Sequence, residues 1–228
     1  MTVWCYECCR LLLAAQLSDA RTAVVKDACA VVCAAAQACG DRFGRCAEYF
    51  TPSLQKLLSA SAAVLRDSAD AALRTIIRVV RSGRLLCGVV LRQGLLAEPR
   101  HPQLRERLQT YLAIALQLWP TPTLDDQQLL DLVEDALFLG VQDAAAEARA
   151  QARKGFGALQ LRWPERAAQV QGRLSVRDLK TLQHQQQQQQ QQEQQQHQQQ
   201  EEEEEVAVGI LLSVSVLSVA LLYCCVLP

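Results

Sequence analysis

The stretch VQDAAAEARAQARKGF, residues 141–156, decides the fold. Alanine fills six of its sixteen positions, and charged side chains stand at 143, 147, 149, 153 and 154. Alanine has the highest helix propensity, and its small side chain lets a helix approach its neighbours closely. An Asp just ahead of such a run can accept hydrogen bonds from the first free N–H groups of the helix. The stretch therefore predicts a closely packed helix that follows Asp143.

The same pattern recurs along the chain. Four copies are separated by 41, 39 and 44 residues at their apolar anchors, which are Val24, Leu65, Leu104 and Ala148. Asp19 stands five residues before the first anchor, as Asp143 stands five residues before the last. A period near 40 with two helices per repeat is typical of HEAT-type α-solenoids, in which each helix pair buries its apolar face against the next pair.

The apolar residues also predict where the helices lie. Between clusters of Gly and Pro they recur at steps of three or four, as in Val24, Ala28, Val31, Val32 and Ala35. No stretch between His101 and Gln183 alternates with period two, so the fold is predicted to be all-α. We expect four helix pairs and one further helix, at 3–17 with 21–39, 47–59 with 62–81, 83–96 with 101–118, 125–139 with 144–161, and 164–182.

Composition places the main part of the chain in the cytosol. Residues before 184 carry 23 basic and 18 acidic side chains, a net charge of +5, whereas the six later glutamates give the remainder −6. The opening residues, MTVWCYECCRLLLAAQ, have neither the basic n-region nor the cleavage site of a signal peptide. Eight of the ten cysteines lie in this part, and we expect them to be thiols that pack as small apolar side chains.

Two segments of different composition follow residues 1–183, which we take as the folded domain. Residues 184–205 contain no apolar residue and predict a Gln/Glu-rich linker. Residues 206–228 carry no charge, and as a helix of about 34 Å they could cross a bilayer's hydrocarbon core. We interpret them as a candidate transmembrane tail anchor with residues 1–205 in the cytosol, although the flanking glutamates add no positive-inside signal. A buried hydrophobic helix and a spurious sequence end are the alternatives.

The sequence shows no recognisable catalytic or metal site. Cys5 and Cys8 form a CxxC motif, but a zinc site needs four ligands, and no second pair or nearby His follows. The three histidines, at 101, 184 and 197, leave no nucleophile, base and orienting group at a plausible spacing. We therefore expect no enzyme, and no cofactor, metal or small-molecule substrate.

Two groups of charged residues are interpreted as helix surface. Arg74, Arg78 and Arg81 line one helix face without aromatic residues between them, which favours a solvated face over nucleic-acid binding. Acidic residues gather in the first turns of another helix, where carboxylates interact favourably with the helix dipole, so they need no ligand. These are Asp125, Asp126, Asp131, Glu134 and Asp135.

Several stretches together resemble one family. They are VVKDACAVV (24–32), ACGDRFGRCAEYFTPSLQKLL (38–58), LRTIIRVVRSGRLL (73–86), QLWPTPTL (117–124), DAAAEARAQARKGF (143–156) and RWPERAAQVQGRL (162–174). In order and spacing they are similar to the TOG domains of the cytoplasmic-linker-associated proteins, the CLASP family of microtubule regulators, over about residues 10–182. The resemblance implies a flat paddle of HEAT repeats whose within-pair loops form one edge that binds the tubulin heterodimer. In this chain those loops are near 18–22, 59–62, 97–101 and 140–144.

The chain departs from the family pattern in two ways. TOG domains usually have six repeats, and here the chain begins inside what resembles the second, so the first repeat and its tubulin-contacting aromatic loop are expected to be missing. Such a truncated paddle could expose an apolar end and bind tubulin weakly. Gly155 and Gly157 stand where the family has bulkier residues, and each destabilises a helix interior by about 1 kcal/mol relative to Ala.

The resemblance implies that basic residues at or just after the loops contact tubulin, whose surface is acidic. We favour Lys26 and Arg100 as direct contacts, whereas Arg66, Arg105 and Arg149 fit equally well as a ladder with the Asp of an adjoining repeat. The full candidate set is Arg21, Lys26, Arg66, Arg100, Arg105, Arg149 and Arg153.

These inferences predict a tubulin- or microtubule-binding module of the cytoplasm and cytoskeleton, tethered to a membrane by residues 206–228. The alternatives are a HEAT-repeat scaffold for another protein, and a fragment of a longer gene product.

Overall fold

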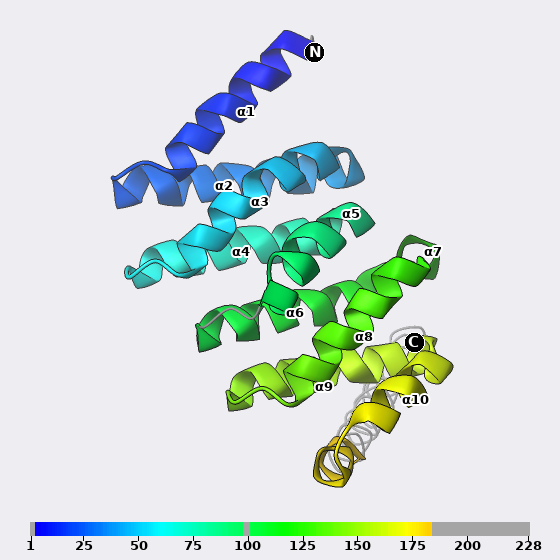
Figure 1. Ribbon diagram of the computed structural model, residues 1–228. Helices are drawn as coiled ribbons and strands as arrows, with labels where there is room; N and C mark the ends of the chain where they lie inside the picture. Colours follow the sequence, from blue (N-terminus) through cyan, green and yellow to red (C-terminus); the bar gives the residue numbers. More distant parts are fainter. Residues whose placement is uncertain (1–2, 98–100, 184–228) are drawn as a thin grey trace, which may run out of the picture. The chain divides into compact units, whose positions relative to one another are not determined.

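The structure confirms an all-α fold. The computed structural model describes residues 3–97 and 101–183, and within these ranges it contains helices and no strand (Figure 1). The chain divides into one compact unit, residues 1–178, and a second unit from residue 179 onward, of which residues 179–183 are described and helical. The linker predicted at 184–205 and the hydrophobic segment at 206–228 lie outside the described residues.

The first unit is a row of antiparallel helix pairs. In chain order its elements are α1 (Val3–Leu17), α2 (Thr22–Cys39), η1 (Gly40–Phe43), α3 (Gly44–Leu58), α4 (Ala63–Val79), α5 (Gly83–Leu85), η2 (Leu86–Arg92), η3 (Leu95–Ala97), α6 (Pro102–Leu118), α7 (Thr121–Leu124), α8 (Gln127–Val141), α9 (Ala146–Arg162) and α10 (Pro164–Arg173). Helices α2, α4, α6 and α9 contact one another in sequence and form one layer, while α1, α3, η2 and α8 form the other (Figure 1).

The predicted repeat is present in the backbone. Helices α2, α4, α6 and α9 begin at residues 22, 63, 102 and 146, which keeps the anchor spacing of 41, 39 and 44. The residue six positions after each start is buried in every copy, and these residues are Ala28, Ala69, Leu108 and Ala152. Each repeat therefore places a small or flexible apolar side chain at the same point of the layer, where neighbouring helices meet.

One predicted apolar stripe was wrong in its register. In α2 the core is formed by Val25 and its neighbours one turn apart, whereas Val31 is 52% exposed. The matching positions in the next three layer helices, Ala72, Tyr111 and Gly155, are buried. Those helices have a preceding layer helix beside them, while α2 has a layer neighbour on one side only among the described residues.

Two predicted helices are interrupted. The helix expected at 83–96 becomes a π-helix over Leu86–Arg92 and then a separate 3₁₀ turn, and a carbonyl of the π-helix, that of Val89, accepts a hydrogen bond of 2.9 Å from Gln55 Nε2. The last predicted helix, 164–182, stops at Arg173 and resumes at 176. The Ser175 hydroxyl accepts from the Asp178 N–H at 3.2 Å, so Ser175 caps the resumed helix and sets the break.

The segment Thr22–Leu58 is long and apolar enough, by length and composition alone, to cross a membrane. In the structure it is not one straight helix, because Gly40 adopts φ +55° between α2 and α3. A positive φ is readily available to glycine and strained for other residues, so the chain reverses here and α2 and α3 each present a core face.

Close approach between helices explains the alanines and glycines around α9. A Cβ at Gly140 in α8 would lie 2.2 Å from Gln109 Nε2 and 2.7 Å from the Ala152 Cβ. At Gly155 a Cβ would lie 3.0 Å from the Leu137 side chain, so this glycine fits a tight contact, whereas Gly157 has nothing within 4 Å. Close packing therefore explains the glycine at 155, although glycine has a low helix propensity.

Candidate functional site

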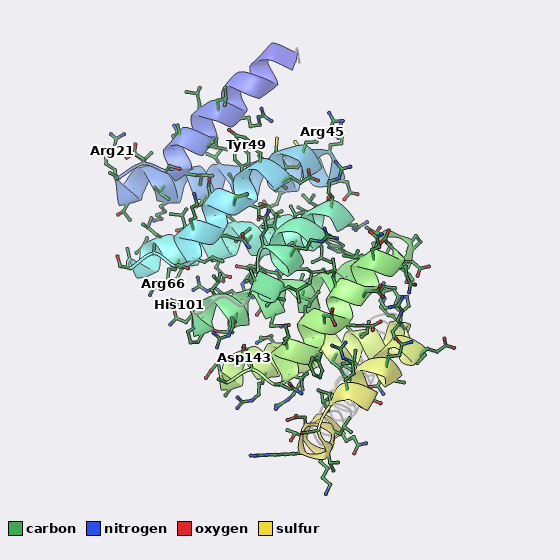
Figure 2. The ribbon with its side chains drawn as sticks, in the orientation of Figure 1. Arg21, Arg45, Tyr49, Arg66, His101 and Asp143 are labelled. Atoms are coloured by element: carbon green, nitrogen blue, oxygen red, sulfur yellow. The ribbon has the colours of Figure 1, made fainter. Side chains whose placement is uncertain are left out.

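The loops inside the helix pairs lie along one edge of the stack. We call this the loop edge and define it, among the described residues, as 18–21, 59–62, 97, 101 and 142–145 with the first two turns of the helices that follow. Figure 2 shows Arg21, Arg66, His101 and Asp143 along it, and Arg45 at the other side. The alignment follows from the repeat, because α2, α4, α6 and α9 all begin here.

Two aspartates shape the first and last of these loops in the same way. The Asp19 carboxylate accepts from the Arg21 N–H, and the Asp143 carboxylate accepts from the Ala145 N–H, both at 2.8 Å. Each Asp lies three residues before its helix, so its carboxylate accepts a hydrogen bond from the N–H of the residue just before the helix. The prediction that Asp143 accepts from the first N–H groups of the helix itself was therefore wrong by one residue. Such Asx-type bonds fix the loop backbone.

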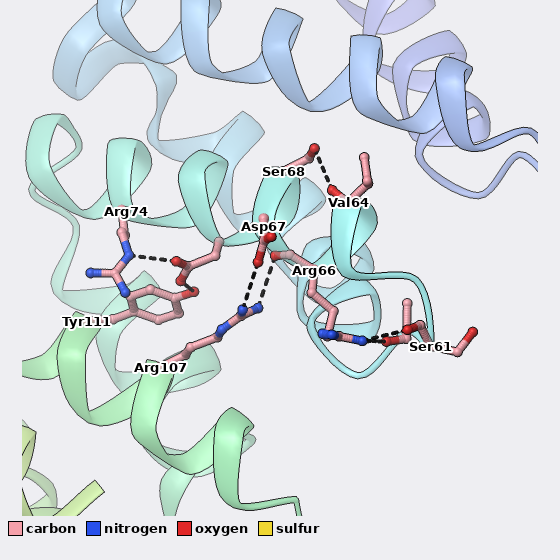
Figure 3. Close-up of polar contacts among 10 residues, drawn as sticks. Ser61, Val64, Arg66, Asp67, Ser68, Arg74, Arg107 and Tyr111 are labelled. Atoms are coloured by element: carbon pink, nitrogen blue, oxygen red, sulfur yellow. Dashed lines mark hydrogen bonds and ion pairs between the residues drawn. The ribbon is translucent and has the colours of Figure 1, made fainter. Parts of the chain in front are cut away.

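Two arginines donate hydrogen bonds to the carbonyls of the loops that precede them. The Arg66 guanidinium donates to the carbonyls of Ala60 and Ser61 at 2.8 and 2.6 Å (Figure 3). Arg149 makes the matching pair of bonds to the carbonyls of Asp143 and Ala144, at 2.6 and 2.8 Å. Both arginines occupy the fourth position of their helix. Each cation stays at the loop edge while it satisfies backbone oxygens that would otherwise lack a partner.

Arg105 forms the ladder that the sequence suggested. Its guanidinium contacts the Asp143 carboxylate of the next repeat through two bonds, at 2.6 and 2.9 Å, and the two side chains are 20% and 9% exposed. Burial acts to raise the pKa of Asp143, but the hydrogen bonds from Arg105 and Ala145 outweigh it, and the pKa is lowered. Arg149 reaches the carbonyl of Asp143 and not its carboxylate, so the ladder belongs to Arg105.

A second set of hydrogen bonds between repeats was not predicted from the sequence. Arg107 of α6 donates to the Arg66 carbonyl at 3.0 Å and to the Asp67 carboxylate at 3.2 Å (Figure 3). One turn further along α6, the Tyr111 hydroxyl donates to Asp70 at 2.6 Å, and burial raises the pKa of Tyr111 well above its usual range. These partners lie 40 and 41 residues apart, one repeat, which is the only sequence signal that could have suggested them.

The remaining candidate cations differ in exposure. Arg21 pairs with Asp19 at 2.9 Å with its side chain 75% exposed, and this bond lowers the pKa of Asp19 to about 2. Lys26 is exposed in the second turn of α2. Arg153 is half-buried, and burial lowers its pKa. Arg100 lies outside the described residues. Of the described candidates, Arg21 and Lys26 reach furthest into solvent.

The acidic residues near the start of α8 have structural partners. Asp126 caps the helix by accepting from the Leu129 N–H at 2.9 Å, as the dipole argument anticipated. Asp131 and Glu134 instead bind Arg166 of α10, and Asp135 binds Arg173 of the same helix. These carboxylates therefore fasten α10 to α8. Among the described residues, no three His, Cys, Asp or Glu side chains are grouped as metal ligands would be.

The sequence is similar to that of one protein family over most of its length. The family model described as "CLASP N terminal" matches residues 4–189. A CLIP-associated protein of Arabidopsis thaliana is 32% identical over 172 residues, and CLIP-associating protein 1 of Xenopus tropicalis is 27% identical over 165, each match covering 72% of this chain. The chain spans only 12% and 11% of the lengths of these relatives.

Two solved structures share the fold. One comes from work on how crescerin uses a TOG domain array to regulate microtubules in the primary cilium, with a TM-score of 0.59, 16% identity, and 80% of this chain and 75% of that chain covered. The other comes from work on TOG–tubulin binding specificity in microtubule dynamics and mitotic spindle formation, with a TM-score of 0.58, 16% identity, and coverage of 76% and 64%.

Proposed function

Because this chain belongs to the CLASP N-terminal family, we propose that it is a tubulin-binding module that contacts tubulin through the loop edge and so regulates microtubule dynamics. The observation that carries the proposal is the alignment of loops from successive repeats along one edge (Figure 2). A row of loops with basic side chains suits a large, acidic, relatively flat protein surface, because complementary charge steers association and fixes register.

The basic residues of the edge fall into two roles in this proposal. Arg21 and Lys26 are exposed and meet tubulin carboxylates directly, and we place Arg100 with them. Arg66, Arg105 and Arg149 hold the loops in shape through their bonds to carbonyls and to Asp143. These three and Arg153 still add positive potential to the edge. Each exposed pair contributes modestly, so binding depends on the set acting together.

Co-sedimentation with stabilised microtubules, and size exclusion with free tubulin, test the proposal on the full chain in non-ionic detergent. We expect binding that weakens with salt, because the Debye length falls from about 10 Å at 0.1 M to about 3 Å at 1 M. Replacing Arg21 and Lys26 together by Glu should weaken binding by at least about tenfold, since attraction becomes repulsion at two contacts. Both side chains are exposed, so the melting temperature should change by less than about 2 °C.

A matched control makes the same change in charge at the far side of the stack. Arg81 and Arg84 are exposed there, at the ends of α4 and α5 away from the loop edge, and both are replaced by Glu. This control should bind microtubules as the unmodified chain does. Equal loss in both variants would show that net charge alone drives binding. Unchanged binding in the Arg21 and Lys26 variant would move the contact to another surface and favour a HEAT scaffold for a different protein.

We also propose that the module works in the cytoplasm at the cytoskeleton, as residues 1–183 followed by a linker at 184–205. Residues 206–228 would tether it to a membrane with the folded domain in the cytosol. The support for the tether is compositional, because 23 successive residues carry no charge. Such an arrangement would hold tubulin or microtubule ends beside a bilayer.

A further inference from the structure

Five arginines gather at the side of the stack opposite the loop edge. They come from the junction between α2 and α3 and from the junction between α4 and α5, and all five are exposed. We call this surface the arginine edge and define it as Arg42, Arg45, Arg78, Arg81 and Arg84. Figure 2 shows Arg45 at this side, away from Arg21 and Arg66.

Hydrogen bonds join the two segments that carry these arginines. The Arg81 backbone N–H donates to the Asp41 carboxylate at 2.9 Å, although the two residues are 40 positions apart. The Ser82 hydroxyl lies 3.4 Å from the Glu48 carboxylate in a second link between the same segments. Asp41 therefore accepts from a backbone N–H and Glu48 from a hydroxyl, and neither bond involves an arginine side chain. Five guanidinium groups beside two carboxylates leave the surface with a net charge near +3.

The arginines of the arginine edge differ from most other described arginines in whether their guanidinium groups have partners within the fold. Elsewhere most arginines are held, as Arg105 is by Asp143, Arg166 by Asp131 and Arg162 by backbone carbonyls. Within residues 3–97 and 101–183, no ion pair or hydrogen bond engages the guanidinium of any of the five. Their charge is therefore available to something outside the fold.

Local helix electrostatics do not account for this clustering. Cations near a helix C-terminus are stabilised by the dipole, which explains Arg78 in the last turn of α4. Arg45 is the second residue of α3 and Arg84 the second residue of α5, where the dipole disfavours a positive charge. The helix dipole therefore gives no reason for a cation at these two positions. An anionic partner explains them directly.

We propose that the arginine edge binds a short run of acidic residues in an extended peptide of a partner protein. Guanidinium groups pair with carboxylates in a bidentate geometry, and several neighbouring ones match successive acidic side chains. Nucleic acid fits less well, because Phe43 is buried and the Tyr49 ring already has the Arg10 guanidinium 4.4 Å from its centroid, so aromatic faces for base stacking are taken up. A lipid surface also fits less well, because no large apolar side chain is exposed between residues 40–48 or 78–84.

The test measures binding of a fluorescein-labelled oligo-glutamate peptide, about ten residues long, by fluorescence anisotropy. The full chain is used in non-ionic detergent with Glu201–Glu205 replaced by Gln, so that the probe is the only acidic run present. We expect saturable binding that weakens steeply with salt. Replacing Arg81 and Arg84 by Glu should raise the dissociation constant at least about tenfold, because two attractive contacts become repulsive. The bond from the Arg81 backbone to Asp41 does not involve the side chain, so folding should be retained, as circular dichroism will show.

The matched control is the loop-edge variant with Arg21 and Lys26 replaced by Glu, which makes the same change in net charge. It should bind the peptide within about twofold of the parent chain, because exposed charges separated by several Debye lengths are screened from each other. Equal weakening by both variants, or no saturable binding, would overturn the proposal. So would tighter binding through the same arginines to a single-stranded oligonucleotide or to phosphatidylserine vesicles. Because tubulin binding is assigned to the loop edge, either proposal can fail without the other.

Discussion

The bond between Arg105 and Asp143 is the most informative single interaction to perturb, because it joins two repeats at the loop edge. Asp143→Asn removes the negative charge but leaves a carbonyl oxygen that can still accept from Ala145. Arg105→Met removes the guanidinium and keeps much of its stem. Each change leaves the other partner at a site where the side chains are only 20% and 9% exposed.

The size of the effect follows from burial and geometry. Hydrogen bonds to charged groups contribute about 1.5–3 kcal/mol, and breaking a fully buried ion pair costs about 3–5 kcal/mol. This pair is bidentate but keeps some contact with water, so we expect each single substitution to lower the free energy of unfolding by about 2 kcal/mol. For a domain of this length that corresponds to a melting temperature about 4–8 °C lower. The double variant should lose less than the sum, with a coupling energy of about 1–2 kcal/mol.

The contribution should also depend on pH. The folded-state pKa of Asp143 is lowered, so its carboxylate binds a proton less readily in the folded chain than in the unfolded one. Its contribution to stability is therefore complete above the unfolded pKa, about 3.9, and is lost as the pH falls through the lower folded value. The stability gap between the unmodified chain and Asp143→Asn should be constant from pH 5 to 7 and narrow below about pH 4.

Urea unfolding followed by circular dichroism measures these energies, with Asp67→Asn as the control. Asp67 belongs to a similar inter-repeat pair with Arg107, but its side chain is 72% exposed, so its loss should cost under about 1 kcal/mol. Additive effects of the two substitutions in the Arg105–Asp143 cycle would refute the reasoning. So would a loss at Asp143 no larger than the loss at Asp67.

Three further predictions concern packing, thiol chemistry and the tail. Gly140→Ala should lower stability by about 1–3 kcal/mol because its Cβ meets two side chains, whereas Gly157→Ala, with open space, should raise it by about 1 kcal/mol, both measured by urea unfolding. Iodoacetamide should label the exposed thiol of Cys39 but spare Cys29, whose pKa burial raises to about 11, as peptide mass spectrometry will show; labelling of both at equal rates would contradict this. The full chain should resist carbonate extraction from membranes, while a chain lacking residues 206–228 should be released; release of both would rule out the anchor.

The sequence was sufficient to predict the repeat because one apolar residue near the start of each layer helix recurs with the period of the repeat. The spacing of Val24, Leu65, Leu104 and Ala148 equals the spacing of the helix starts, since each anchor lies two residues into its helix. The exposure of Val31 was not predictable in the same way. Periodicity shows which residues share a helix face, but whether a face is covered depends on the neighbour that packs against it.

The polar ties were harder to predict for a related reason. Arg105, Arg107 and Arg149 all lie within reach of a loop, and the stagger between adjacent helices decides which of them meets Asp143 and which meets Asp67. That stagger arises from close contacts such as the one at Gly140, which no local pattern encodes. The arginine edge depends on the same geometry, because its members come from two junctions about 40 residues apart.

The bonds that span one repeat also determine how the stack can deform. Trp119 Nε1 donates to the Ile77 carbonyl at 2.7 Å, and the bonds from Arg105, Arg107 and Arg81 likewise connect each repeat to the adjacent one. Helix pairs linked only to their neighbours behave as hinges in series, so a small rotation at one junction carries every later loop with it. The distance between successive loops can then change through small rotations at the junctions between repeats. A partner that grips several loops at once would select, and stiffen, one curvature of the stack.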